Sequence, residues 1–157
     1  MIDVKKLVLY NESVRHRYFE ALSRLPWKEF VKNREASFHS LRNIFIHTLD
    51  AIDYWLDFLQ KENLHTHRKF DQYHTFQDVE TYMEHVETRT HKYFNSLPTG
   101  RLKKKYEITS DTNEPVEITA EDVLIHVFEE EVHHRGELIA LLWQMNVQPP
   151  QMGWKEL

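Results

Sequence analysis

The stretch TAEDVLIHVFEEEVHHRGELIALLWQM, residues 119–145, has the pattern of one long helix. Thr119 is suited to the N-cap position with Asp122 three residues on, and the pattern ends before Asn146. The residues expected to face a core are Val123, Val127, Leu138, Leu141 and Leu142. The centre of the helix, EEEVHHRGE at 129–137, is either a solvated face or part of a metal site, and most of the functional interpretation depends on which it is.

Three more long helices are predicted upstream. The first covers residues 3–23, where apolar side chains follow a spacing of three to four with one long gap. The second covers 37–63, with Ser37 as its N-cap and apolar residues on two neighbouring faces. The third begins near Thr75 and stops at SLPTG, residues 96–100. Four helices of this length indicate a helical bundle.

One excursion interrupts the helices before the last of them. Tyr106, Ile108, Val116 and Ile118 are spaced by two on either side of SDTNEP, which predicts a small β-hairpin. The fold class expected is therefore all-α: an antiparallel four-helix bundle with a β-hairpin excursion before the last helix. We expect residues 1–157 to form a single domain.

Composition limits the classes of function. The 157 residues include no Cys, which excludes disulfides and zinc-thiolate sites, so any metal must be held by His, Asp or Glu. The formal net charge of -5 argues against broad binding to nucleic acid. No stretch approaches the roughly 20 apolar residues of a membrane span, and no signal peptide is visible. A cytoplasmic protein that does not associate with membranes is expected.

A metal site is predicted from three residues. Glu130 and His134 are four positions apart and project from the same face of their helix. His47 lies in the middle of the second helix, between apolar residues, on the face expected to point into the bundle. Together they make a set of two histidines and one carboxylate, which suits one divalent transition metal such as zinc, nickel, iron or manganese. The alternatives are a surface ion pair between Glu130 and His134 and a core histidine at position 47.

Several neighbouring residues are secondary candidates. His126 and Glu137 lie one turn before and one turn after the predicted ligands on the last helix, so they are the candidates for catalytic acid–base roles. Tyr54 and Trp55 are the candidates for substrate binding, although core packing is the more common role of such residues. Gly136 is expected to allow close helix packing. The histidines expected at loop or exposed positions, to which we assign no role, are His65, His67, His74, His85 and His91.

The motifs together resemble those of the DinB/YfiT-like family of metal-binding four-helix bundles. The residues that carry the resemblance are His47 followed by Asp50 and Tyr54–Trp55, the stretch LIHVFEEEVHHRGEL at 124–138, and the C-terminal LLWQMNVQPP. The family's last helix typically carries His-x-x-x-His followed directly by Arg-Gly-Gln or Arg-Gly-Glu. The resemblance covers essentially the whole chain.

The resemblance implies a ligand set. His47 matches the family's ligand on the second helix, and His134 matches the last ligand of the His-x-x-x-His pair. This chain departs from the pattern at Glu130, where many members carry His. A carboxylate can ligate equally well, but it lowers the net charge of the site by one.

The resemblance also implies a class of function. Relatives of this fold include metal-dependent enzymes that act with low-molecular-weight thiols. We therefore expect a metal-dependent transferase or hydrolase that acts on a small-molecule substrate. A low-molecular-weight thiol is the partner that the resemblance implies. Two alternatives stay open: a metal-binding, stress-related bundle without catalysis, and a metal-free interaction module. A homodimer is expected and fits all three.

Overall fold

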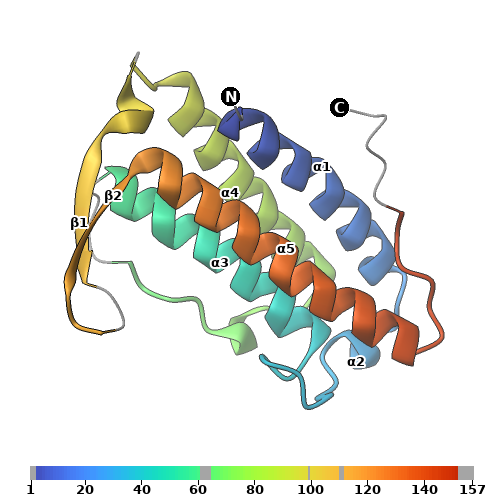
Figure 1. The fold of residues 1–157 in the computed structure, drawn as a ribbon. Helices are drawn as coiled ribbons and strands as arrows, with labels where there is room; N and C mark the ends of the chain where they lie inside the picture. Colours follow the sequence, from blue (N-terminus) through green and yellow to red (C-terminus); the bar gives the residue numbers. More distant parts are fainter. Residues whose placement is uncertain (1–2, 61–64, 99, 110–111, 152–157) are drawn as a thin grey trace.

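The computed structural model describes residues 3–60, 65–98, 100–109 and 112–151. Its long helices are α1 (Val4–Ser23), α3 (Leu41–Gln60), α4 (Phe76–Asn95) and α5 (Ala120–Gln144). They lie side by side as a bundle, in which α4 and α5 each contact both α1 and α3 (Figure 1). The helical bundle expected from the sequence is confirmed.

Short elements occupy the ends of the bundle. A single helical turn, α2 (Trp27–Phe30), follows α1. At the opposite end, β1 (Lys105–Thr109) pairs antiparallel with β2 (Pro115–Thr119), next to η2 (Arg101–Lys103) (Figure 1). The predicted hairpin is confirmed, and β2 leads directly into α5.

The second predicted helix starts later than expected. His39 has a φ of 70°, in the left-handed region, and a right-handed helix cannot pass through such a residue. Helix α3 therefore begins at Leu41, and Ser40 in place of Ser37 accepts a hydrogen bond from Asn43 N, at 3.2 Å. The predicted end of this helix at residue 63 lies outside the described residues.

The other helix ends are as predicted. Thr75 and Asp78 form a complete capping box at the start of α4, and Thr119 and Asp122 form another at the start of α5. Asn146, with a φ of 55°, turns the chain out of α5 in a left-handed conformation. Each of these capping residues lies within one helical turn of the helix end that it marks.

The connection from α3 to α4 sets the direction of the helices. Residues 65–75, including η1 (Phe70–Gln72), return along the length of the bundle, so α3 and α4 run in the same direction (Figure 1). The backbone N–H of Arg68 donates to Asp50 on α3, at 3.1 Å, which attaches this segment to the bundle. Helix α5 then runs antiparallel to α3 (Figure 1).

The core contains a buried charge cluster as well as apolar side chains. Arg15 on α1 is only 6% exposed, and its guanidinium donates to Glu131 on α5 at 2.7 Å and to Glu87 on α4 at 2.9 Å. The Glu131 side chain is 5% exposed and that of Glu87 is 11% exposed. One cation therefore joins three helices and compensates the charge of Glu131 and, together with His16 at 2.9 Å, that of Glu87.

Gly136 does not serve close packing, contrary to the sequence-based expectation. It lies on the exposed side of α5, and a Cβ atom added to it meets nothing within 4 Å. Its φ is not in the left-handed region. The glycine therefore costs conformational entropy without relieving a contact within the chain.

Replacing Gly136 by alanine is expected to stabilise the fold. Because an interior helical glycine costs about 1 kcal/mol relative to alanine, Gly136→Ala should raise the free energy of unfolding by about 0.5–1 kcal/mol. Urea denaturation followed by circular dichroism measures this. An unchanged or lower midpoint would mean that another surface, such as a second copy, approaches this position.

Candidate metal centre

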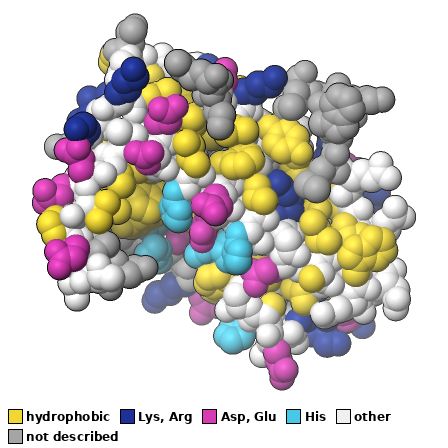
Figure 2. Space-filling model, viewed as in Figure 1, with side chains coloured by type: hydrophobic (Ala, Val, Ile, Leu, Met, Phe, Trp, Pro, Cys, Tyr) yellow, Lys and Arg dark blue, Asp and Glu magenta, His cyan; other side chains and the backbone are white. Residues whose placement is uncertain are grey.

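Three side chains from α3 and α5 converge on one point. His47 Nε2 lies 3.3 Å from Glu130 Oε1, and His134 Nε2 lies 3.2 Å from the same oxygen. The candidate ligand atoms of the three residues all lie within 4.8 Å of one another. The structure thus brings together the two histidines and the carboxylate selected from the sequence. Figure 2 shows histidine and acidic side chains gathered on this face, with hydrophobic patches beside them.

A second layer of contacts holds His134. Its Nδ1 atom lies 2.6 Å from Glu137 Oε2, and the same oxygen accepts a hydrogen bond from Ser37 Oγ at 2.8 Å. The His134 side chain is only 6% exposed. A carboxylate behind a histidine fixes its ring orientation and tautomer, as in the outer shell of many metal sites. Glu137 therefore orients His134, and its carboxylate is engaged in doing so.

The hydrogen-bonding demands of this group favour a cation. Glu137 can only accept, so His134 Nδ1 carries a proton. In the neutral ring, Nε2 then directs a lone pair at Glu130 Oε1, which is also an acceptor. Either a second proton on His134 or a metal ion between the two atoms removes this repulsion. Imidazole nitrogen and carboxylate oxygen are common ligands of zinc and similar ions, so the residues fit such an ion.

The loop before α3 covers the other histidine. Glu35 and His39 both have left-handed φ values, 56° and 70°, so the backbone reverses on either side of residues 36–38. This reversal places Phe38 on His47, with ring centroids 3.9 Å apart and planes 19° from parallel. Phe38 also meets His134 edge-on at 5.4 Å. An aromatic ring thus shields the two histidines, which lowers the local polarity around the candidate ligand atoms.

The protonation equilibria of the group follow from burial and contact. Burial lowers the pKa of His47, although the hydrogen bond to Glu130 opposes that effect. Partial burial would raise the pKa of Glu130, but its contacts with His47 and His134 outweigh that effect and lower the pKa. A neutral imidazole and an ionised carboxylate are the forms that bind a metal.

The secondary candidates lie around this group in different ways. His126 is exposed and lies edge-on to Trp55, with ring centroids 5.4 Å apart. Within the described part of the chain, no hydrogen bond joins it to Glu130. Tyr54 is 37% exposed and Trp55 is half-buried, and their rings meet at 5.0 Å. Both aromatic side chains are therefore accessible near the seam between α3 and α5, and neither is a fully buried core residue.

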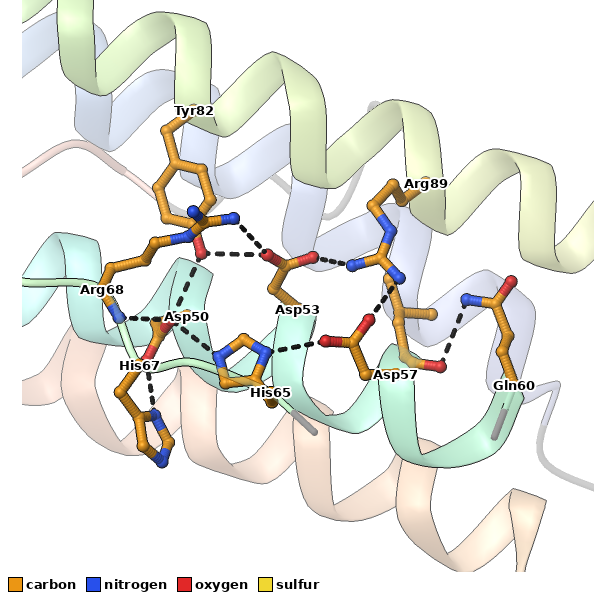
Figure 3. Close-up of polar contacts among 10 residues, drawn as sticks. Asp50, Asp53, Asp57, Gln60, His65, His67, Arg68, Tyr82 and Arg89 are labelled. Carbon is orange, nitrogen blue, oxygen red and sulfur yellow. Dashed lines mark hydrogen bonds and ion pairs between the residues drawn. The ribbon is translucent and has the colours of Figure 1, made fainter. Parts of the chain in front are cut away.

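A second polar cluster was missed by the sequence analysis. His65 lies in a loop, which was one of the two expectations for it, but its side chain is only 5% exposed and lies between two carboxylates of α3 (Figure 3). Its Nε2 atom is 3.0 Å from Asp50 Oδ1, and its Nδ1 atom is 2.8 Å from Asp57 Oδ2. His67, which is 73% exposed as expected, places Nδ1 2.8 Å from Asp50 Oδ2. The recurrence of Asp50, Asp53 and Asp57 along an otherwise apolar helix was the signal that could have indicated it.

Glu137 offers a test of the outer contacts. Glu137→Gln keeps the size of the side chain but weakens its hold on the His134 ring, so we expect metal affinity to fall about 10–100-fold. Competition with a chromophoric chelator measures this. Ser37→Ala, which removes only the contact behind Glu137, is the matched control and should have a smaller effect. Equal affinities of wild type and Glu137→Gln would show that Glu137 does not orient a ligand.

Comparison with known proteins assigns the class. The family model described as DinB family matches residues 1–156, and the chain belongs to the DinB family. A curated relative, the uncharacterized protein YizA of Bacillus subtilis (strain 168), is 26% identical over 146 residues, covering 92% of this chain and 89% of the relative.

Two solved structures share the fold. A conserved protein from Enterococcus faecalis superposes with a TM-score of 0.67 at 13% identity, covering 90% of this chain and 95% of that one. The DinB-like protein YjoA from Bacillus subtilis superposes with a TM-score of 0.65 at 17% identity, covering 94% and 97%. These likenesses establish the bundle fold. Among the described residues, no helix has both the length and the apolar character needed to cross a membrane.

Proposed function

We propose that this protein binds one divalent transition metal through His47, Glu130 and His134 and acts as a metal-dependent transferase or hydrolase with a low-molecular-weight thiol. The observation that carries the metal is the position of Glu130 Oε1, which faces a ring nitrogen of each histidine at 3.3 and 3.2 Å. The thiol rests on the resemblance to the DinB/YfiT-like family.

The net charge of the ligand set suits an anionic partner. Two neutral histidines and one carboxylate leave a divalent ion with a formal charge of +1, which one thiolate would neutralise. A divalent ion with an open position supplies a Lewis-acid centre that lowers the pKa of a thiol or water. The chain's own part is to hold the ligands in place: Glu137 and Ser37 fix His134, and Phe38 stacks on His47.

Two accessible aromatic residues of α3 complete the proposal. Tyr54 and Trp55 offer an accessible surface on which the carbon skeleton of a substrate could pack. Because Glu137 is engaged with His134, His126 is the better candidate for a proton acceptor. In a transfer reaction the thiol would lose its proton, its sulfur would bond to an electrophilic carbon, and the leaving group would depart with the bonding electron pair.

Conjugation of small thiols to a chromogenic electrophile tests this function. Metal-free protein is assayed with and without added zinc, nickel and manganese, against a panel of cellular thiols. We expect a rate that depends on both metal and protein, lost in His47→Ala and lowered in His126→Ala without loss of bound metal. Absence of a metal-dependent rate with every thiol in the panel would refute the transferase.

A non-catalytic role is the second candidate. The predicted ligands come from α3 and α5, so a bound metal would connect two helices and raise the melting temperature. If chelation lowers the melting temperature while no reaction is found, the protein is a metal-stabilised bundle. The predicted homodimer is compatible with either role. Its support is the exposure of Ile125, Val132 and Trp143 on α5, and light scattering tests it.

A further inference from the structure

The cluster around Asp50 has the composition of a second metal site, separate from the one proposed above. Asp50 Oδ1 faces His65 Nε2 at 3.0 Å, and Asp50 Oδ2 faces His67 Nδ1 at 2.8 Å. One candidate ligand atom from each residue lies within 4.8 Å of the others. The set again contains two imidazoles and one carboxylate, which favours zinc, nickel or cobalt over magnesium or calcium.

The surroundings of the cluster orient both buried ligands. Asp57 Oδ2 lies 2.8 Å from His65 Nδ1, so in the neutral ring the proton is on Nδ1 and the lone pair of Nε2 faces Asp50 (Figure 3). This is the carboxylate–histidine arrangement that commonly stands behind a metal ligand. Asp50 is held in turn by the backbone N–H of Arg68 at 3.1 Å and by the Tyr82 hydroxyl at 3.4 Å. The two buried candidates, His65 and Asp50, are therefore held in position from behind.

The charges of the cluster leave room for a cation. Asp50, Asp53 and Asp57 contribute three carboxylates along one side of α3, whereas Arg68 and Arg89 contribute two guanidinium groups (Figure 3). Arg89 donates to Asp53 and Asp57, and Arg68 donates to Asp53. Among the described residues, neither guanidinium side chain pairs with Asp50, whose side chain is 7% exposed and whose possible cationic partners are His65 and His67. A buried carboxylate of this kind requires a positive partner.

One member of the cluster is exposed to solvent. Asp50 and His65 are 7% and 5% exposed, but His67 is 73% exposed. The Tyr54 ring is stacked against His67, with centroids 5.7 Å apart and planes 17° from parallel. An ion can therefore enter from the surface and be held by two buried residues and one accessible residue.

The cluster is distinct from the first site although both use α3. His47 and Asp50 are one helical turn apart, but His47 meets Glu130 on α5, whereas Asp50 meets the 65–68 segment and Tyr82 on α4. We propose that Asp50, His65 and His67 form a second site for a divalent transition metal, which fastens the segment leading to α4 onto α3. This inference does not depend on the proposed enzymatic activity.

Metal stoichiometry tests the proposal directly. Untagged full-length protein is stripped of metal and titrated with cobalt(II), whose absorption reports nitrogen and oxygen ligation, and with zinc. The variants are His47→Ala for the first site, His67→Ala for the second, and the double variant. His67 is chosen because its exposure makes its replacement harmless to folding, which circular dichroism checks. His74→Ala, an exposed histidine at the start of α4, is the matched control.

The expected result is about two equivalents of metal per chain in wild type and His74→Ala, about one in each single variant, and about none in the double variant. If wild type and His47→Ala each bind about one equivalent and His67→Ala binds none, the second site stands and the first is refuted. If His67→Ala binds as much metal as wild type, the second site is overturned, and the Asp50 cluster is a hydrogen-bonded attachment of the 65–68 segment with His65 as an imidazolium.

Discussion

His134→Ala is expected to abolish metal binding at the α3–α5 site. The His134 ring is 6% exposed, contacts Glu130 through Nε2 and is held by Glu137 through Nδ1, so its removal deletes one proposed ligand and releases another. Loss of an outer contact alone costs about 10–100-fold in affinity, and loss of a ligand should cost more than about 100-fold. Competition titration with a chelator measures the affinity, and the thiol-conjugation rate should fall with it.

His133→Ala is the matched control for this change. The two histidines are neighbours on α5 but project about 100° apart around the helix axis, and His133 is exposed. The metal affinity of His133→Ala should stay within a few-fold of the wild-type affinity. Because His133 also lies near His134 and Glu137, the comparison is informative in both directions. Loss of metal in His133→Ala with retention in His134→Ala would show that His133, not His134, is the ligand. That result would refute the proposed set of His47, Glu130 and His134.

Arg15→Met is expected to produce the largest loss of stability. The change keeps most of the side-chain volume but leaves Glu131 and Glu87 buried without their shared cation. Removal of one partner from a buried charge cluster costs about 3–5 kcal/mol. For a chain of this length, that should lower the melting temperature by about 10 °C. Thermal and urea unfolding followed by circular dichroism measure both quantities.

The pH dependence of Arg15→Met adds a second readout. Burial raises the pKa of Glu87 even in wild type, although Arg15 opposes the shift, and loss of Arg15 should raise that pKa further. A carboxyl with a raised folded-state pKa binds its proton more readily in the folded than in the unfolded chain. Folding is therefore favoured as pH falls toward the unfolded-state pKa, and the stability deficit should be smaller near pH 5 than at pH 7.

Arg24→Met is the surface control for Arg15→Met. Arg24 pairs with Glu20 on the same helix, but the two side chains are 74% and 66% exposed. Such pairs contribute about 0–1 kcal/mol. A loss in Arg15→Met no larger than that in Arg24→Met would show that the Arg15 cluster does not stabilise the bundle.

Only part of the candidate site could be predicted from the sequence. Glu130 and His134 are one turn apart on a single helix, so their proximity follows from helical geometry alone. His47 was selected as a polar residue within an apolar stretch, and its meeting with Glu130 spans 83 positions. The contacts of Phe38 and Ser37 were not predicted, because they depend on two left-handed residues, Glu35 and His39, that no turn-forming Gly marks.

By itself, the sequence determined that the helices and the hairpin form, and it determined the caps of α4 and α5, because these features depend on hydrogen bonds and side-chain periodicity within a few residues. It also determined the pair of candidate ligands on α5. Only the tertiary structure decided that α3 and α4 run in the same direction and that His65 is buried between Asp50 and Asp57. Those features depend on how the segment between α3 and α4 packs across the bundle. There, charge compensation between residues distant in sequence outweighs the tendency of a polar loop to stay in solvent.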